Sequence, residues 1–263
     1  MKNKKERVYY YRDELNDDFA ENNIKTKPLN ERYIFADDSF FGRVGEFVVY
    51  RIIAQPLVTA FIKLVWLQRF KNRRVMKELK GGAFIYANHT GDVIDAFIPN
   101  FVCCRKHNHI IVGPDAMSIK GLNGLLRMLG AIPIGSSVKQ MGQMMECIDR
   151  RISEGRLVTI YPEAHIWPYY TRIRPFPAAS FRYPCKSGTP VYTMTTCYKK
   201  RAVGKLPKAV TCVDGPFFPK EELPIKQRMQ ALRDECYAAM CRRAEEESDY
   251  EYVKYVKLPE EKE

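Results

Sequence analysis

Histidine is scarce in this chain of 263 residues, and the short motifs of several common enzyme classes are missing. The histidines are His89, His107, His109 and His165. The sequence lacks GxSxG, GxxxxGKS/T, HExxH and GxGxxG, which argues against a serine nucleophile elbow, a phosphate loop, a zinc-protease helix and a dinucleotide-binding turn. Without a nucleophile elbow, we favour a reaction assisted by a general base over one that forms a covalent enzyme intermediate.

A secretory leader, paired cysteines and a long uncharged apolar run are also missing. The N-terminal residues MKNKKERVYYYRDELNDD contain no apolar core, so we expect no secretion and a cytoplasmic location. The eight cysteines form no CxxC pair, which indicates free, buried thiols. The most apolar stretch contains Glu46, Arg51 and Lys63, and its longest uncharged run is Ile52–Ile62. A crossing helix needs about 20 apolar residues, so we expect no membrane span.

The charge of the chain is positive but unevenly placed. The net charge is +12, while residues 245–263 hold eight acids and three lysines, a net of −5 that leaves +17 on the remainder. A basic body favours an anionic partner: nucleic acid, a membrane surface with anionic lipids, or an acidic carrier. No nucleic-acid module and no basic–aromatic stripe are present, so we expect no nucleic-acid partner and keep nucleic-acid binding only as an alternative.

Residues 41–80 are predicted to form an amphipathic, basic helical segment. Its apolar stripe is Tyr50, Ile53, Ala54, Leu57, Val58, Phe61, Leu64 and Val65, and the opposite ladder is Arg51, Gln55, Thr59 and Lys63. Pro56 should break or bend the helix. A basic cluster follows: Arg69, Lys71, Arg73, Arg74, Lys77 and Lys80. The segment is typical of a helix in an anionic membrane interface, and an ordinary helix packed on the domain is the alternative.

From residue 81 the pattern alternates between strand and helix. Predicted strands are Ala83–Ala87, His109–Val112, Ala131–Ile134, Leu157–Tyr161, Val191–Tyr198 and Ala209–Val213. Predicted helices are Asp92–Cys104, Gly121–Leu129, Val138–Ser153, Ala178–Lys186 and about Pro224–Glu246. We therefore expect an α/β domain over residues 81–247, with a mixed, largely parallel sheet flanked by helices and the amphipathic attachment before it. Residues 1–40 should be a polar extension with little core, and residues 248–263 an acidic tail.

His89 is the strongest candidate for a general base. It lies in FIYANHTGDVIDAF, after an apolar strand and before a helix, where α/β sheets carry reactive groups. A nearby carboxylate, Asp92 or Asp95, could fix its tautomer and raise its basicity. Exposed amides at the helix start could hold an oxyanion. A simple turn, with Asp92 as a helix-start acid, is the alternative.

A second polar segment, YPEAHIWPYYTRIRP, follows another predicted strand. Glu163 ends that strand, and Arg172 and Arg174 follow among aromatic residues. Arginine forks suit phosphate or carboxylate, although a solvated loop and a carboxylate that caps backbone amides are the alternatives. The segment CCRKHNHI holds Cys103, Cys104, His107 and His109, but adjacent cysteines on a helix point apart and no second cluster completes a set. We predict no metal.

The blocks around His89 and Glu163 resemble those of the glycerolipid acyltransferases, the 1-acylglycerol-3-phosphate acyltransferase-like group. Asn88–His89 with Asp95 resembles the family's Asn-His…Asp signature. Further similar blocks are GLLRMLGAIPI (124–134), YPE (161–163) and RPFPAASFRYPCKSGTPVYTM (174–194). The resemblance covers roughly residues 81–215, with the four blocks in the family's order.

Three departures from the family pattern concern the acceptor. Five residues separate His89 from Asp95, one more than in the family, and we prefer Asp95 to Asp92 because the apolar residues after it align better. Gly135–Ser137 stand where the family has an arginine for the acceptor's phosphate, and Ala164–His165 replace Gly-Thr. Arg172, Arg174 or Lys139 is then expected to supply the anion contact.

The resemblance implies an enzyme that moves a fatty acyl group from a thioester, acyl-CoA or acyl carrier protein, to a hydroxyl of a lysophospholipid or glycerol-phosphate-type acceptor. It implies that His89 is the base, that Asp95 orients it, and that Glu163 and the arginines organise the acceptor. No stored cofactor is expected, and the enzyme should lie on the cytoplasmic face of a membrane. A membrane-associated hydrolase and a non-catalytic homologue are the alternatives.

Overall fold

The structure is a computed structural model that describes residues 7–20, 26–37, 39–62, 64, 68–103, 105–114, 116–118, 121, 123–202, 204 and 206–259. For Asp92 and Val93 it describes the backbone only, and the predicted stripe residue Val65, the ladder residue Lys63 and Cys104 lie outside these ranges.

Seven strands form the main sheet, in the order β2-β8-β7-β3-β6-β4-β5. Their bounds are β2 Arg69–Lys71, β3 Ala83–Ala87, β4 Asn108–Val112, β5 Ala131–Pro133, β6 Leu157–Ile160, β7 Val191–Lys199 and β8 Lys208–Phe217. The β7–β8 pair is antiparallel and every other pair in this sheet is parallel. The predicted class, a mixed and largely parallel sheet flanked by helices, is confirmed.

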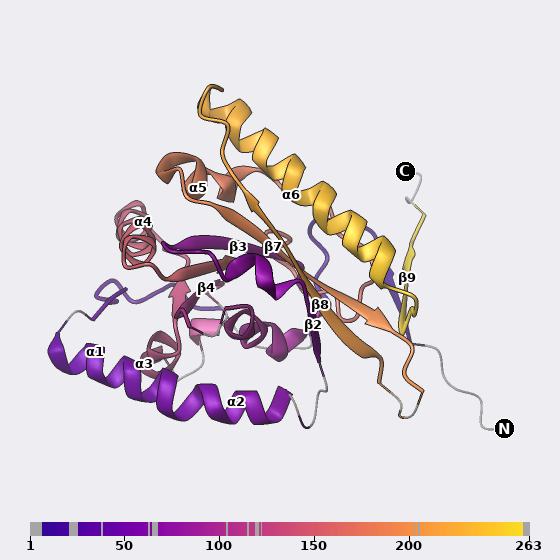
Figure 1. Ribbon diagram of the computed structural model, residues 1–263, viewed down its shortest axis with the longest axis horizontal. Helices are drawn as coiled ribbons and strands as arrows, with labels where there is room; N and C mark the ends of the chain where they lie inside the picture. The colour runs from indigo at the N-terminus through magenta and orange to yellow at the C-terminus, as the bar shows by residue number, and fades with distance from the viewer. Residues whose placement is uncertain are drawn as a thin grey trace.

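The side chains of the central strand β3 point alternately to the two faces of the sheet, and each face has its own hydrophobic core. Phe84 and Tyr86 pack in a cluster with residues of α4 (Val138–Ser153), α5 (Arg182–Ser187) and α6 (Ile225–Glu247). Ala83, Ile85 and Ala87 point to the other face, where short helices cover the sheet. These are η3 Arg73–Met76, η4 Asp92–Ala96 and η5 Ile98–Phe101. Further short helices in the described part of the domain are η6 Ala116–Ser118, α3 Asn123–Met128 and η7 Ala179–Phe181. Figure 1 shows α6 crossing one side of the sheet, while α1 and α2 run along the lower edge.

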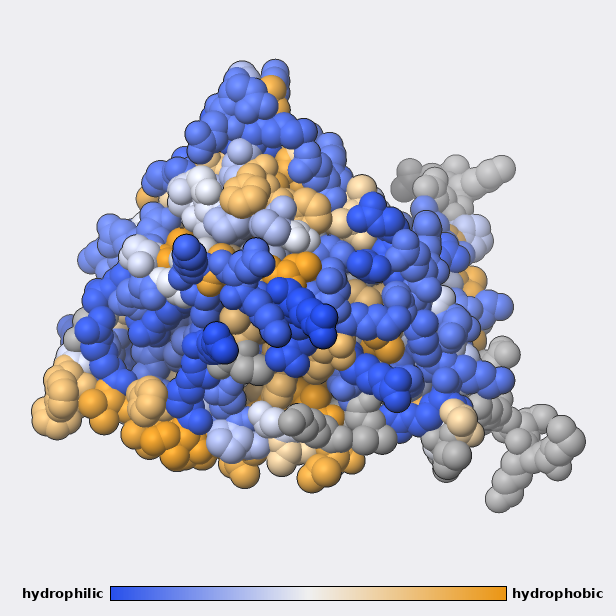
Figure 2. Space-filling view, in the orientation of Figure 1, coloured by the Kyte–Doolittle hydropathy of each residue, from blue (hydrophilic) through white to orange (hydrophobic). Residues whose placement is uncertain are grey.

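The N-terminal helical segment is continuous from Phe40 to Phe61 and leaves a large apolar face exposed. It consists of α1 Phe40–Phe47, the π-helix η1 Val48–Ala54 and α2 Gln55–Phe61. Pro56 does not break the helix; it stands in the first turn of α2, directly after the π-helix, where proline is tolerated. Figure 2 shows apolar side chains along the lower edge, where α1 and α2 lie.

Some residues of the predicted apolar stripe face the domain, and others are exposed. Tyr50 is buried, and Ala54 and Val58 line a cavity against the domain. Leu57 is 66% exposed, and Ile53, Phe61 and Leu64 are exposed as well. The helix packs on the domain with one face, as one of the two alternatives predicts. Another face presents exposed apolar side chains, a feature on which the membrane-interface alternative depends.

By length and composition alone, one helical run among the described residues, Phe40–Phe61, could cross a membrane. It has 22 residues, a mean hydropathy of 1.3 in its best window, and 11% of that window buried. No span is expected from the sequence, because Glu46 and Arg51 interrupt the apolar run. In the structure both side chains turn to the domain, where Glu46 meets Arg156 and Arg51 donates to the carbonyl of Arg105 at 2.6 Å.

The end of the predicted helical segment is a strand, which corrects the expectation of helix up to residue 80. Arg69–Lys71 forms β2 and pairs in parallel with β8, with Arg69 opposite Val210. Without β2, β8 would be the edge strand and its outer main-chain groups would be unsatisfied; β2 supplies their partners. Lys71 also bonds Glu247 at 2.7 Å, which ties the basic segment to the end of α6.

The two ends of the chain meet in a second sheet, which the sequence analysis did not predict. β1 (Arg7–Tyr11) pairs in parallel with β9 (Val253–Lys257), with Arg7 opposite Val253. The sheet packs on Trp167, whose ring stacks on Tyr255 at 4.8 Å. Residues 1–40 also contribute Leu29 and Phe35 to the core, so this extension adds more core than expected.

Candidate active site

The candidate site lies where two neighbouring parallel strands end. β3 ends at Ala87 and is followed by Asn88 and His89, and β6 ends at Ile160 and is followed by Tyr161 to Glu163. β3 and β6 pair directly, with Tyr86 opposite Ile160. The carboxyl ends of adjacent parallel strands share one edge, which is why residues 74 positions apart, His89 and Glu163, come together.

His89 and Asp95 form a hydrogen-bonded pair. His89 Nδ1 lies 2.8 Å from Asp95 Oδ2, and the His89 side chain is 18% exposed while Asp95 is buried. The short helix η4, rather than the longer α-helix that the sequence predicts, carries Asp95 back to the imidazole. The structure thus brings Asp95 to His89; the side chain of Asp92 lies outside the described part of the chain.

The amides of His89, Thr90 and Gly91 each donate to a carboxylate, so an oxyanion site formed by later amides at the helix start stays a prediction. The Asp95 carboxylate also accepts from Thr90 N at 3.0 Å and from Gly91 N at 2.9 Å. The amide of His89 donates to Glu163 at 3.1 Å. These three amides therefore stabilise the turn and do not face an oxyanion. A Cβ on Gly91 would stand 2.3 Å from the Asp95 carboxylate, so the turn needs glycine at this position.

Glu163 and Arg174 form a buried pair behind the turn, not an open anion site. Glu163 accepts from the amides of His89 and Arg174, both at 3.1 Å. Its carboxylate lies 3.5 Å from the guanidinium of Arg174, which is fully buried and lies over the Trp167 ring at 5.0 Å. Burial raises the pKa of the Glu163 carboxyl, and the positive Arg174 opposes the rise. In this structure Arg174 shapes the loop and does not face the pocket.

The other two predicted cations lie on exposed positions. Lys139 is exposed on α4, and Arg172 is exposed on the loop before Arg174. No hydrogen bond or ion pair between described residues joins either side chain to the turn at His89. The structure therefore does not bring Lys139, Arg172 and Arg174 together around the imidazole.

Aromatic residues that the sequence analysis did not single out complete the site. The amides of Trp167 and Tyr169 donate to the carbonyls of His89 and Thr90, at 3.1 and 3.0 Å. Tyr161 donates to the Asp95 carbonyl at 2.6 Å, and its ring lies 4.5 Å from the ring of His89. Burial raises the pKa of Tyr161 well above its ordinary value, so the phenol stays a donor. Only the position of Tyr161 directly after β6 could have indicated this role.

Two adjoining cavities lie beside the turn. One of about 710 Å³ is lined by Thr90 and Gly91, by residues of α2 and β1, and by Pro168, Tyr169 and Tyr198. A second, of about 160 Å³, lies between the N-terminal helix, η5 and α3, and its lining is almost entirely apolar. Val58 and Phe97 line both cavities. The larger one can hold a molecule with a long apolar part next to the turn that carries His89.

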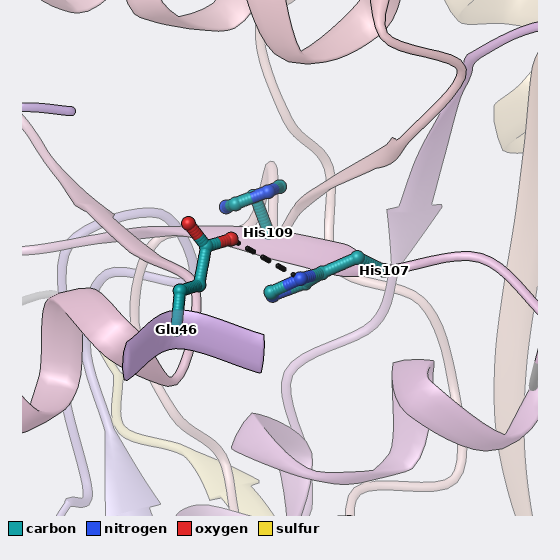
Figure 3. Close-up of side chains that lie close together, drawn as sticks. All are labelled: Glu46, His107 and His109. Carbon is teal, nitrogen blue, oxygen red and sulfur yellow. Dashed lines mark ion pairs between the residues drawn. The ribbon is translucent and has the colours of Figure 1, made fainter. Parts of the chain in front are cut away.

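A separate polar cluster joins α1 to β4 (Figure 3). The possible ligand atoms of Glu46, His107 and His109 lie within 4.8 Å of one another, and His107 Nδ1 is 3.2 Å from Glu46. Arg156 bonds Glu46 and approaches His109 Nε2 at 3.2 Å, and Arg151 lies 3.7 Å from Glu46.

The surroundings of this cluster suit neutral imidazoles better than a cation. Burial, together with nearby arginines, lowers the pKa of His107 to about 2, and burial lowers that of His109 well below its ordinary value. The guanidinium of Arg156 already occupies the oxygen and nitrogen that a metal would need. We interpret the cluster as the attachment of the helix to the domain, and the absence of a metal stays a prediction.

Comparison with known proteins identifies the family. The sequence pattern of the acyltransferase family matches residues 62–196, just over half of the chain. The chain belongs to the acyltransferase family. The acyltransferase family that the motifs indicate is thereby confirmed.

A solved structure shares the fold of this acyltransferase family member. It is the 1-acyl-sn-glycerophosphate acyltransferase PlsC from Thermotoga maritima, at a TM-score of 0.53 and 15% identity over 79% of this chain and 88% of that chain. A likeness at this identity establishes the fold only. No curated protein matches the sequence.

Proposed function

We propose that this protein transfers a fatty acyl group from a thioester, acyl-CoA or acyl carrier protein, to a hydroxyl of a lysophospholipid or glycerol-phosphate-type acceptor. The single observation that carries the proposal is the His89–Asp95 pair, at 2.8 Å, on a turn beside an apolar cavity in a member of the acyltransferase family. The related PlsC is by its name an acyltransferase that acts on 1-acyl-sn-glycerophosphate.

His89 is the general base in this proposal. With Nδ1–H donated to Asp95, Nε2 is the nitrogen that can accept a proton from the acceptor hydroxyl. The hydroxyl oxygen then attacks the thioester carbonyl, and the thiolate that leaves takes up the proton from the imidazolium. Asp95 stabilises the imidazolium between these two transfers, and Glu163 holds the backbone of His89 in place.

The apolar cavities indicate a substrate with a long hydrocarbon chain. The smaller cavity is bounded by Ala54 and Val58 on one side and by Phe101, Ile110 and Leu129 on the other. It shares Val58 and Phe97 with the lining of the larger cavity. A fatty acyl chain fits this composition, whereas a nucleic-acid chain does not.

The exposed face of the N-terminal helix supports attachment to a membrane. Phe41 is 83% exposed and Leu57 66%, and the apolar patch continues along Phe40, Phe47, Ile52 and Phe61. A basic cluster follows whose members, Arg69, Lys71, Arg73, Arg74, Lys77 and Lys80, are all exposed. An apolar face next to positive charge favours a helix in the interface of an anionic membrane, which we propose to be the cytoplasmic face.

Incubation with labelled oleoyl-CoA and a panel of lyso-acceptors, followed by lipid mass spectrometry, tests the proposed reaction. We expect a diacyl product, and we expect His89→Ala to reduce its rate by ~10²–10⁴-fold because the base is removed. His165→Ala is the matched control, because His165 is a partly exposed loop histidine that pairs with Asp18 at 3.5 Å and lines neither cavity. Equal activity of wild type and His89→Ala would refute the assignment.

The same incubation separates the alternatives. Free oleate without diacyl product would indicate a hydrolase that uses His89 to activate water. No release and no transfer with any acceptor, from a folded protein that still binds vesicles, would indicate a non-catalytic homologue.

A further inference from the structure

The larger cavity contains one cationic side chain, Arg7 of β1, among the described residues that line it. The other lining side chains are apolar or aromatic except for Thr90, and they come from several segments of the chain, three of which matter here. α2 supplies Leu57 and Phe61, the turn after His89 supplies Thr90 and Gly91, and β1 supplies Arg7 and Tyr9. A cavity of this composition suits an amphiphile with a negative charge at one end.

Arg7 is held by the other end of the chain. Its guanidinium lies 5.1 Å from the centre of the Tyr252 ring, and Arg7 is opposite Val253 in the β1–β9 sheet. The Tyr252 ring in turn contacts that of Tyr169, at 4.9 Å, which lines the cavity. No carboxylate among the described residues forms an ion pair with Arg7, so its N–H donors are open to a ligand.

We infer that Arg7 binds the anionic headgroup of the lipid acceptor in this cavity. The inference rests on the proposed function and names the residue that selects its acceptor. A lysolipid has an apolar chain, a free hydroxyl and an anionic group, and the cavity presents apolar α2 residues, the His89 turn and a guanidinium. The guanidinium fork can donate two N–H groups to the oxygens of a phosphate.

Arg7 also accounts for the missing arginine of the family pattern. Gly135–Ser137 and Ala164–His165 carry no arginine, and Arg174 is buried against Glu163. Arg7 lies outside the matched residues 62–196, so the headgroup site is built by the paired chain ends and not by the family blocks.

The test compares two acceptors with the same chain, 1-oleoyl-lysophosphatidate and 1-oleoylglycerol, with oleoyl-CoA as donor. We expect Arg7→Ala to raise the KM for lysophosphatidate about tenfold or more, with kcat and the KM for 1-oleoylglycerol unchanged. Arg7→Lys should restore part of the affinity, because it keeps the charge but not the fork. Lys254→Ala is the matched control, since Lys254 is an exposed cation on β9 opposite Val8 and does not line the cavity.

Three results would overturn the inference. They are equal effects of Arg7→Ala and Lys254→Ala, equal effects on the charged and neutral acceptors, or a rise in the KM for oleoyl-CoA alone, which would assign Arg7 to the donor's phosphates. If no acceptor is acylated, the proposed function fails separately. Equilibrium dialysis of labelled lysophosphatidate then tests Arg7 by itself: a Kd that does not rise in Arg7→Ala refutes the inference.

Discussion

Replacement of Asp95 by asparagine tests the proposed base most directly. Asp95 Oδ2 accepts three hydrogen bonds, from His89 Nδ1 at 2.8 Å, Thr90 N at 3.0 Å and Gly91 N at 2.9 Å. Asparagine has nearly the same shape but one oxygen, no charge and an NH₂ that cannot accept. The imidazolium therefore loses its charged partner, while the turn keeps part of its support.

The expected magnitude follows from these contacts. A hydrogen bond to a charged group contributes about 1.5–3 kcal/mol, which corresponds to a loss of about 10- to 150-fold in kcat if it acts in the transition state. The bonds from the Thr90 and Gly91 amides to a neutral oxygen are weaker than those to a carboxylate, which should lower the free energy of unfolding by about 1–3 kcal/mol. Steady-state kinetics with oleoyl-CoA and urea unfolding measure the two effects separately.

A control variant and a double variant test whether Asp95 acts through His89. Asp214→Asn makes the same chemical change in a pair with Arg243, at 2.7 Å, and should affect stability but not kcat. If Asp95 acts through His89, His89→Ala/Asp95→Asn should be no slower than His89→Ala. Asp95→Asn with kcat within about threefold of wild type, or a double variant slowed by both factors, would refute the reasoning.

The pH dependence of stability and the binding to vesicles should each respond to single substitutions. The pKa of His107 is about 2 in the folded protein, against an ordinary 6.5. Between these pH values only the unfolded chain binds a proton at His107. The free energy of unfolding therefore falls as the pH drops below about 6.5 toward 2. Urea unfolding at pH 7 and pH 5 measures this effect. Between these pH values, the free energy of unfolding should fall by about 2 kcal/mol less in His107→Gln than in the wild type. Leu57→Glu and Phe41→Glu on the exposed face should reduce co-sedimentation with vesicles containing anionic lipid by about tenfold or more, because a charge replaces apolar surface.

Each of these has a result that contradicts it. An unchanged loss of stability on acidification in His107→Gln would mean that the buried imidazole accepts a proton in the folded state. For the membrane face, Phe218→Glu is the control, since Phe218 is 56% exposed but follows β8, away from the N-terminal helix. Equal vesicle binding by wild type and both helix variants would exclude this face as the contact.

The sequence by itself determined the helices and strands that have a clear local pattern of apolar and capping residues. The continuous apolar run Ala83–Ala87 predicts a strand buried on both faces, and the structure has it at those residues. Val138–Ser153 begins after Ser137, whose side chain accepts from Gln140 N, and its helix period is regular. His89 and Asp95 are close in sequence, so their pairing could be predicted as well.

Tertiary structure alone decided which charges face the larger cavity. Arg174 and Arg7 differ little in sequence character, yet strand order buries Arg174 against Glu163 and the pairing of the chain ends places Arg7 at the cavity. Glu46, which interrupts the apolar run of the sequence, is paired with arginines of the domain and leaves the apolar face unbroken. Such contacts join residues far apart in the chain, and no local propensity or spacing encodes them because they depend on the order in which the strands assemble.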